Sequence, residues 1–368
     1  MIEINHNANI PIFAVSDAVE MLHRLYSGAV NKGISFKELA TPMLWGSAGV
    51  GKSQGVAQLA KKLEETTGKK TIITDVRLLL FNPIDLRGIP THNNDRTESV
   101  WLKPKIFCMD DSDDVINILL LDEISAAPQT VQAAAYQMCL DRKIGEHRLP
   151  ENCIVIAAGN RTTDKSVSFT MPKALCNRLM HLLIESDFDS WRRWALRNDI
   201  DSRIIGYLSF DRSRLCVEVG SGDMAFATPR SWSFVNSVIK TIGEEPEELH
   251  RLIAGCIGVD SAVEFEHWCK AHGQLPDIED ILLGRCTTYP KSQDALFAVS
   301  ASLITEIYKR HKNVSCAELE NVCGYAKRFP ADFAMSFFKD LASIDEIKLK
   351  LMKCGSMQSW LNDNKKYL

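Results

Sequence analysis

The stretch Gly46-Ser47-Ala48-Gly49-Val50-Gly51-Lys52-Ser53 decides the fold of this chain. It has the P-loop pattern, in which two glycines with four residues between them lead into Lys and Ser. The apolar run 42–45 before it predicts a buried strand, and residues 55–63 after it have the apolar spacing of a helix. Glycines let successive backbone N–H groups point inward, and the helix N-terminus adds partial positive charge. We therefore expect a nucleoside triphosphate here, with Lys52 at its β- and γ-phosphates and Ser53 on Mg²⁺.

The composition is that of an ordinary globular protein. The 368 residues are 45% hydrophobic and 24% charged, enough for two or three domains. A net charge of −4 gives no global basic field for nucleic acid, although it leaves a local basic surface open. No apolar run approaches the roughly 18–20 residues of a membrane helix, and the N-terminus has no signal-peptide pattern.

The cysteines indicate a reducing compartment. There are eleven, an odd number, and none forms a Cys-x-x-Cys pair. Cys139, Cys153 and Cys176 lie within apolar runs, which is typical of reduced core thiols. We therefore expect a cytoplasmic protein.

A second nucleotide motif follows at the end of a predicted central strand. Residues 115–121 form a nearly continuous apolar run, typical of a buried parallel strand. Asp122 and Glu123 come directly after it, as in a Walker B motif. We expect Asp122 to hold the Mg²⁺ shell and Glu123 to polarise the attacking water.

Three further strands complete the predicted core, and three more polar residues are candidates for the site. Strands are expected at 70–78, 153–158 and 180–184, and a helix at 125–140. Asn160 follows the strand 153–158, and Arg178 lies where a short helix, 172–179, meets the last strand. From residue 187 onward the pattern is helical, with Thr228 as the cap, Pro229 in the first turn and Arg230 just inside a helix.

In this order the motifs resemble those of AAA+ ATPases, and specifically the MoxR family. The more specific matches are Asp85-Leu86-Arg87-Gly88-Ile89-Pro90, Arg148-Leu149-Pro150, Ala158-Gly159-Asn160 and Thr228-Pro229-Arg230. The resemblance covers roughly residues 40–235. It implies an α/β fold: a three-layer αβα P-loop sandwich with a five-stranded parallel sheet in the order 5-1-4-3-2. An all-helical lid and a helical C-terminal region follow this sandwich.

The resemblance also implies roles for single residues. Asn160 matches sensor 1, Arg178 matches the arginine finger that completes a neighbouring subunit's site, and Arg230 matches sensor 2. Two hairpins, near 88–101 and at 142–150, match inserts that project toward the pore of ring-forming relatives. The chain departs from the family in having Asn177-Arg178-Leu179 in place of Asp-Arg-Phe, and Arg161 in place of a Pro. Arg161 could therefore share or replace the finger's role.

These matches predict three domains and an assembly. The nucleotide-binding core spans 1–186, a helical lid carrying sensor 2 spans 187–295, and a C-terminal extension spans 296–368. A finger supplied to the next subunit makes a head-to-tail contact that can close into a ring. Six subunits are the family's usual number. ATP and Mg²⁺ are the expected cofactors.

Three functions remain open from the sequence. The first is a ring-forming ATPase that remodels or activates a protein partner, which in MoxR-like proteins commonly bears a von Willebrand factor A domain. The second is a motor on nucleic acid, as in the McrB and MCM relatives; Arg87, Arg96, Lys103 and Lys105 permit it, and the acidic balance argues against it. The third is a nucleotide switch with little turnover, against which an intact Asp122-Glu123 argues.

A zinc site is not expected. His267, Cys269 and His272 lie close in sequence, but at helical spacing His267 and Cys269 diverge. No fourth ligand is evident.

Overall fold

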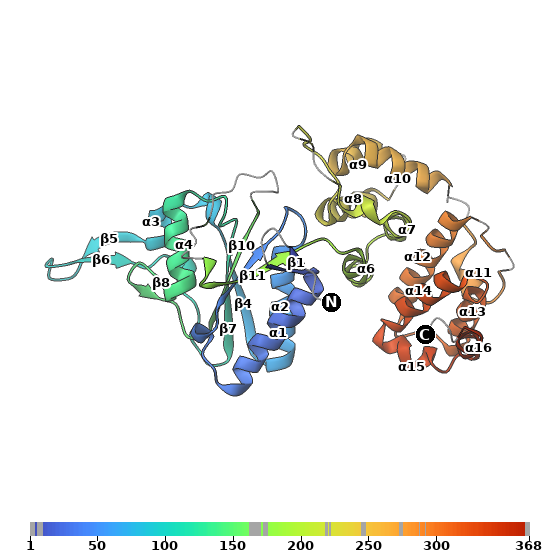
Figure 1. Cartoon of the computed structure of the whole chain (residues 1–368), viewed down its shortest axis with the longest axis horizontal. Coiled ribbons are helices and arrows are strands. Elements are labelled where there is room, and N and C mark those ends of the chain that lie inside the picture. The colour runs from blue at the N-terminus through green and yellow to red at the C-terminus, as the bar shows by residue number, and fades with distance from the viewer. Residues whose placement is uncertain are drawn as a thin grey trace. The chain divides into compact units, whose positions relative to one another are not determined.

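The chain forms two compact units, Met1–Asp187 and Phe188–Leu368 (Figure 1). The computed structural model describes residues 4–5, 10–161, 171, 176–217, 220, 222–243, 248–271, 275–286, 288–290 and 292–364. The predicted short helix at 172–179 lies partly outside these residues.

The first unit is a sheet with helices on both faces. Its strands are β1 (Ile4–Asn5), β2 (Ile10–Phe13), β3 (Thr41–Trp45), β4 (Lys70–Arg77), β5 (Ile89–His92), β6 (Ser99–Leu102), β7 (Val115–Asp122), β8 (Lys143–Ile144), β9 (His147–Arg148), β10 (Cys153–Gly159) and β11 (Leu179–Ile184). Its helices are α1 (Val15–Lys32), α2 (Lys52–Thr67), α3 (Pro83–Arg87) and α4 (Gln129–Asp141), with short 3-10 turns η1 (Phe36–Glu38), η2 (Leu78–Leu80) and η3 (Lys105–Phe107).

The main sheet has seven strands in the order β1-β2-β11-β3-β10-β7-β4. β2, β11, β3, β10, β7 and β4 are parallel, and β1 pairs antiparallel with β2. The predicted five-stranded sheet in the order 5-1-4-3-2 is therefore wrong in strand count and incomplete in order. The four residues of β2 are too few to show a strand pattern, and their pairing with Leu183 and Ile184 of β11 stabilises them.

Alternating side chains of the central strands reach two separate cores. On β7, Ile116, Ile118 and Leu120 pack with α1 and α2, whereas Leu119 and Leu121 pack with α4. Figure 1 shows α1 and α2 on one side of the sheet and α4 on the other. Burial on both faces explains why this strand reads as a continuous apolar run.

The two predicted hairpins are present as β5–β6 and β8–β9. The β5–β6 hairpin extends away from the main sheet (Figure 1). At its base Gly88 has φ 93°, and a Cβ there would lie 1.8 Å from the carbonyl oxygen of Leu102, so only glycine fits. Helix α4 begins at Gln129 rather than at the predicted Ser125, because Pro128 disfavours helical backbone at the residue before it.

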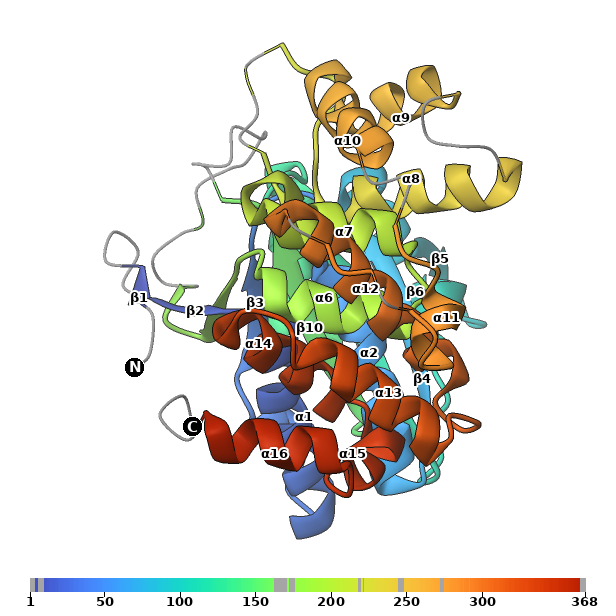
Figure 2. The same cartoon turned by 90° about the vertical axis from the view of Figure 1, so that its right-hand side faces the viewer.

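The second unit is helical in the residues that the structure describes. Its helices are α6 (Phe188–Arg197), α7 (Ser202–Phe210), α8 (Pro229–Ile242), α9 (His250–Ile257), α10 (Val259–Ala271), α11 (Ile278–Leu282), α12 (Gln293–Arg310), α13 (Cys316–Ala326), α14 (Ala331–Ala342), α15 (Asp345–Leu351) and α16 (Gly355–Asp363), with the 3-10 turn η5 (Arg212–Leu215). Figure 2 shows α13 with α15 and α16, which it contacts.

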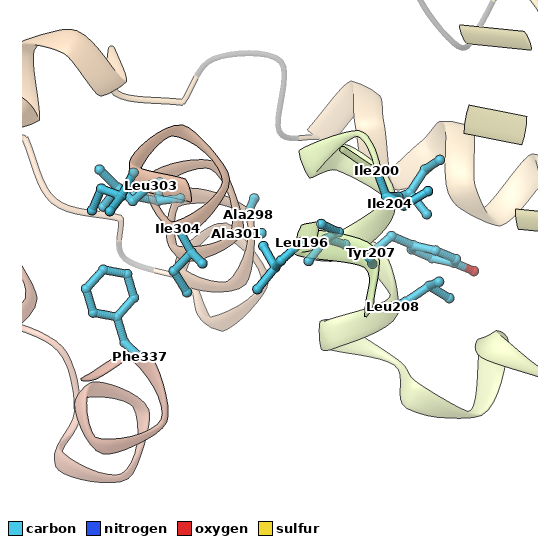
Figure 3. Packing of buried hydrophobic residues seen from close by; sticks show 14 of the residues in the cluster. Leu196, Ile200, Ile204, Tyr207, Leu208, Ala298, Ala301, Leu303, Ile304 and Phe337 are labelled. Carbon is cyan, nitrogen blue, oxygen red and sulfur yellow. The ribbon is translucent and has the colours of Figure 1, made fainter. Parts of the chain in front are cut away.

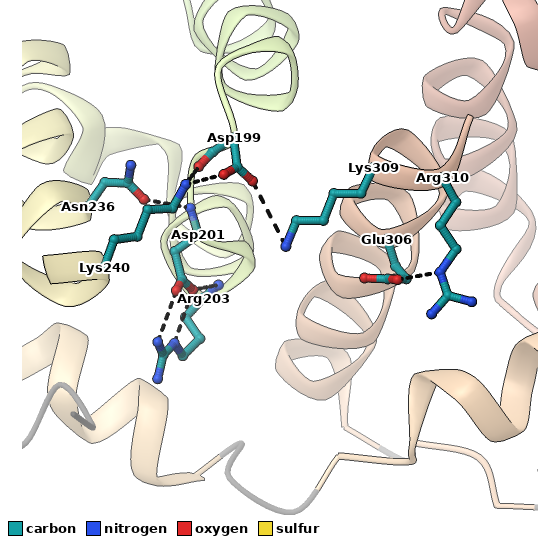
Figure 4. A network of polar contacts seen from close by, with 8 residues as sticks. All are labelled: Asp199, Asp201, Arg203, Asn236, Lys240, Glu306, Lys309 and Arg310. Atoms are coloured by element: carbon teal, nitrogen blue, oxygen red, sulfur yellow. Dashed lines mark hydrogen bonds and ion pairs between the residues drawn. The ribbon is translucent and has the colours of Figure 1, made fainter. Parts of the chain in front are cut away.

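One continuous core runs through this unit, from Phe188 to Trp360. Leu196 of α6 and Ala298 and Ala301 of α12 point toward one another (Figure 3). Ion pairs also join helices of this unit: Lys240 of α8 and Lys309 of α12 both pair with Asp199 (Figure 4). The predicted boundary between residues 295 and 296 falls within α12, and the three-domain division stays a prediction.

Across the described parts of the chain, every helix is too short or too polar to cross a membrane.

Candidate nucleotide site

The P-loop connects β3 to α2 at the carboxyl edge of the sheet. A Cβ on Gly46 would lie 2.5 Å from the backbone oxygen of Ile184, so this position requires glycine. Gly49 and Gly51 have φ values of 83° and 104°, a conformation that other residues rarely adopt. Gly51 is the N-cap of α2, so the loop leads directly into the helix N-terminus. This is the geometry that the motif predicted.

Lys52 is the first residue of α2, and its ammonium group lies over the loop. Nζ donates to the carbonyl oxygen of Gly46, to that of Ser47 at 3.0 Å, and to Oδ1 of Asn160 at 2.9 Å. The predicted phosphate-binding lysine and the predicted sensor residue are therefore in direct contact, although 108 positions separate them.

The two predicted Mg²⁺ ligands also meet. Ser53 Oγ donates to Asp122 Oδ2 at 2.9 Å, and the other carboxylate oxygen of Asp122 accepts from the backbone N–H of Glu123 at 2.8 Å. Glu123 has φ 57°, an uncommon left-handed conformation for a residue other than glycine. It is half-buried, and no hydrogen bond to its carboxylate is recorded among the described residues. This carboxylate is therefore available to a ligand or to water.

A second acidic side chain, which the sequence did not single out, lies near Asp122. Asp75 and Arg77 lie on β4, and Arg77 is the register partner of Asp122. Partial burial and then the charge of Asp122 raise the pKa of Asp75, while Arg77, 3.8 Å away, lowers it. In the sequence, Asp75 and Arg77 were marked only by their position near the carboxyl end of the predicted strand 70–78.

Ser125 holds Asn160 in place. The backbone N–H of Asn160 donates to Ser125 Oγ at 2.9 Å. A Cβ on the preceding residue, Gly159, would lie 2.8 Å from the same hydroxyl oxygen. The glycine therefore lets the two segments approach closely. Ser125 follows the Asp122-Glu123 pair by two residues, but no pattern in the sequence pointed to this contact.

The two candidate finger arginines have different surroundings. Arg161 lies 3.4 Å from Glu185, which follows β11, while Arg161 follows β10. Because β3 lies between these strands, the ion pair spans the end of the strand that leads into the P-loop. Arg178 is exposed, and no hydrogen bond or ion pair to it is recorded among the described residues.

Arg230 belongs to the second unit. It is exposed in the first turn of α8, behind the N-cap Thr228, whose Oγ1 accepts from the N–H of Ser231, as predicted. Its sensor role stays a prediction. Within the described residues no group of three or more His, Cys, Asp or Glu side chains could hold a metal ion, and His272 lies outside them.

No protein-family profile matches the sequence, and a search of curated proteins also gives no match. Several solved structures match the chain at low sequence identity. A mutant of RuvB from Thermotoga maritima is 16% identical with a TM-score of 0.39, over 85% of this chain and 89% of that one. ORC2 of Aeropyrum pernix, in ADPNP and ADP complexes, is 11% identical with a TM-score of 0.39, over 100% of this chain and 96% of that one. PCH-2 of C. elegans is 16% identical with a TM-score of 0.33, over 69% of this chain and 66% of that one. These scores are low, and the interpretation of the site depends on its own geometry.

That geometry fits a magnesium-bound nucleoside triphosphate. The glycine loop is too closely packed at Gly46 to accept a side chain, and Lys52 lies over it. Ser53 and Asp122 present a hydroxyl and a carboxylate, the oxygen ligands that Mg²⁺ prefers. When bound, Mg²⁺ would neutralise charge on the phosphate oxygens.

Proposed function

We propose that this chain is a Mg²⁺-dependent ATPase, of the MoxR type of AAA+ protein, that converts ATP and water to ADP and phosphate. The observation that carries the proposal is the convergence of Lys52, Ser53, Asp122 and Asn160 at the carboxyl ends of β3, β7 and β10. Ligands of open α/β sheets bind at this edge.

Each side chain has a role that its contacts support. The Lys52 ammonium would release the carbonyl oxygens of the loop and bind the β- and γ-phosphates. Glu123 would accept a proton from the attacking water, because its backbone N–H bonds to Asp122 and its carboxylate has no hydrogen-bond partner among the described residues. Asn160 would orient that water or the γ-phosphate through its amide.

We further propose that the site is completed by a second copy of the chain. Arg178 is exposed and could reach a neighbouring subunit, whereas Arg161 is held by Glu185 of its own chain. This favours Arg178 as the finger. A head-to-tail contact of this kind closes into a ring, and the resemblance to MoxR proteins suggests six subunits. Arg230, in a lid spanning 187–295, would act as sensor 2, with 296–368 as a C-terminal extension.

The work of the ring would be to remodel or activate a protein partner. The support is the β5–β6 hairpin, which extends from the core and exposes Ile89 and Leu102 at 62% and 57%. A partner with a von Willebrand factor A domain is the class that the resemblance implies. We place the protein in the cytoplasm, and its eleven free cysteines fit a reducing compartment.

Glu123→Gln tests the function. The variant should bind ATP with the affinity of the parent and lose at least about a hundredfold in turnover, the scale of a general base. Turnover comparable to that of the parent would remove Glu123 from this role. Affinity purification of the same variant with ATP should retain a protein partner, and Lys52→Ala, which should not bind ATP, is its control.

The second candidate is a motor on nucleic acid. Arg87, Arg96, Lys103 and Lys105 are all exposed on and around the β5–β6 hairpin. DNA or RNA retained by Glu123→Gln, with binding that weakens steeply as salt rises, would favour this candidate over protein remodelling.

A further inference from the structure

Two hydrogen-bonded aromatic side chains, with nearly parallel ring planes, connect the strand before the P-loop with the turn that carries Arg178. Trp45 is the last residue of β3, and its Nε1 donates to Nδ1 of His181 on β11 over 2.8 Å. The ring centroids are 6.0 Å apart and the planes differ by 15°. The other ring nitrogen of His181, Nε2, lies 2.8 Å from the carbonyl oxygen of Cys176.

These contacts determine the protonation of the imidazole. An indole N–H can only donate, so Nδ1 of His181 accepts and carries no proton. A carbonyl oxygen can only accept, so Nε2 carries the proton and donates it to Cys176. The neutral ring of His181 therefore extends a single chain of hydrogen bonds from Trp45 to Cys176.

Both ends of this chain are next to residues of the proposed site. Trp45 is joined by a peptide bond to Gly46, whose carbonyl oxygen accepts from Lys52. Cys176 precedes Arg178 by two residues, in the turn before β11. Holding the Cys176 carbonyl restricts the positions of that turn, while the Arg178 side chain stays exposed.

We propose that His181 is a positioning residue, which with Trp45 holds Arg178 in place for the neighbouring subunit and links that place to the P-loop of its own subunit. The inference rests on the proposed function, because it takes Arg178 as a finger acting between subunits.

The test uses mixtures of two full-length chains. Arg178→Ala keeps its own nucleotide site but cannot complete its neighbour's, and Lys52→Ala has the opposite defect. In an equal mixture the Lys52→Ala chain supplies Arg178 to the intact sites, so ATPase activity should recover. His181→Phe is then added to the Lys52→Ala chain, which keeps a ring beside Trp45 and removes both nitrogens.

We expect the recovered kcat to fall about tenfold to a hundredfold, the effect of displacing a reacting group by about an ångström. The KM for ATP should stay unchanged, because the chain that binds ATP carries only Arg178→Ala. Trp45→Phe in the Lys52→Ala chain removes the indole donor and keeps an aromatic ring, and it should also lower the recovered kcat.

His311→Phe is the matched control. Its Nδ1 lies near the carbonyl oxygen of Tyr308 and its ring lies 5.7 Å from the Tyr308 ring, in the second unit. Recovery should be unaffected by this change. If the His181→Phe chain does not assemble, as judged by size-exclusion chromatography, the positioning role is tested with the Trp45→Phe chain alone.

The outcomes distinguish the positioning role of His181 from the proposal that two subunits share one ATPase site. Full recovery with the His181→Phe and Trp45→Phe chains would overturn the positioning role and leave the ATPase intact. Failure of the unmodified mixture to recover would overturn the shared site, and the positioning role with it.

Discussion

The Lys52 ammonium has three hydrogens, and three oxygens of its own chain lie in position to accept them, from Gly46, Ser47 and Asn160. A bound triphosphate must take over some of these bonds. The amide of Asn160 is then free to turn toward the γ-phosphate or the attacking water. If the site binds a triphosphate as we propose, the lysine and the asparagine would exchange partners.

Asn160→Ala should therefore affect turnover more than binding. We expect kcat to fall roughly a hundredfold to a thousandfold, since a positioned polar donor is worth about that much in a transition state. Steady-state ATPase assays and titration with a fluorescent nucleotide measure the two quantities. Asn198→Ala, which removes an amide bonded to the Trp194 carbonyl in the second unit, is the control. An equal loss in binding and in turnover would argue against a role in the chemical step.

Sequence reasoning located the residues that local motifs mark, and it missed those that depend on distant pairing. Ser53 and Asp122 come from two recognisable motifs, and their hydrogen bond follows from the parallel sheet. Ser125 beside Asn160 could not be found in this way, because the contact depends on the register of β10. Arg178 and Arg230 remain predictions, since their proposed roles depend on where the neighbouring subunit and the second unit lie.

At the scale of elements, the P-loop is held by its close fit to β11. Gly46→Ala would place a Cβ 2.5 Å from the Ile184 carbonyl oxygen, and a backbone atom cannot easily move aside. We expect a loss of about 1–3 kcal/mol in the free energy of unfolding, together with weaker ATP binding. The measurement is urea unfolding followed by circular dichroism.

Gly28→Ala is the control for Gly46→Ala, because it makes the same change at another position of the first unit. Gly28 lies within α1, and a Cβ there meets nothing within 4 Å. Alanine should stabilise this helix by roughly 0.5–1 kcal/mol, the difference between the two residues in a helix interior. Opposite signs for the two glycines would support the close fit at Gly46, whereas two stabilising substitutions would contradict it.

The N-cap of α7 should make the second unit sensitive to acid. Asp201 caps Arg203 N–H and pairs with its guanidinium at 2.9 Å (Figure 4). Burial alone would raise the pKa of Asp201, but the hydrogen bonds and charge of Arg203 outweigh it, and the pKa is lowered. A lowered folded pKa means that the carboxylate stabilises the fold above its ordinary value of 3.8, and that this stabilisation is lost as the pH falls through the folded pKa.

Asp201→Asn should therefore cost about 1 kcal/mol at pH 7, since an amide keeps the cap and loses the charge. This difference from the parent should shrink as the pH falls below about 4. Urea unfolding followed by tryptophan fluorescence at several pH values measures it. Thr228→Ala removes a hydroxyl cap that does not titrate, and its cost should stay constant over the same range. A constant cost for Asp201→Asn would show that its charge contributes nothing.

The fold was predictable where one strand carries its own pattern and unpredictable at the sheet's edge. Val115–Asp122 was evident because both of its faces are buried. Ile10–Phe13 was missed because four residues become a strand only through their pairing with β11. In the helical second unit, apolar spacing predicted helices but not the shared core that joins Leu196 to Ala301 (Figure 3).

At the scale of the whole molecule, the finger role that we propose for the exposed Arg178 predicts that activity depends on assembly. Specific ATPase activity should fall when the protein is diluted through the range in which its oligomer dissociates. The loss should approach the roughly thousandfold scale of an arginine finger once subunits are separate. Activity and analytical ultracentrifugation are measured over one dilution series at saturating ATP.

The activity of Arg178→Ala should be low at every concentration, because its sites lack the finger whether or not the subunits associate. Arg285→Ala, which removes an exposed arginine paired with Asp280 in the second unit, should follow the parent. Specific activity that stays constant while the sedimenting species changes from oligomer to monomer would mean that one chain holds the complete site. Arg161, paired with Glu185 beside its own P-loop, would then be the arginine to test within the subunit.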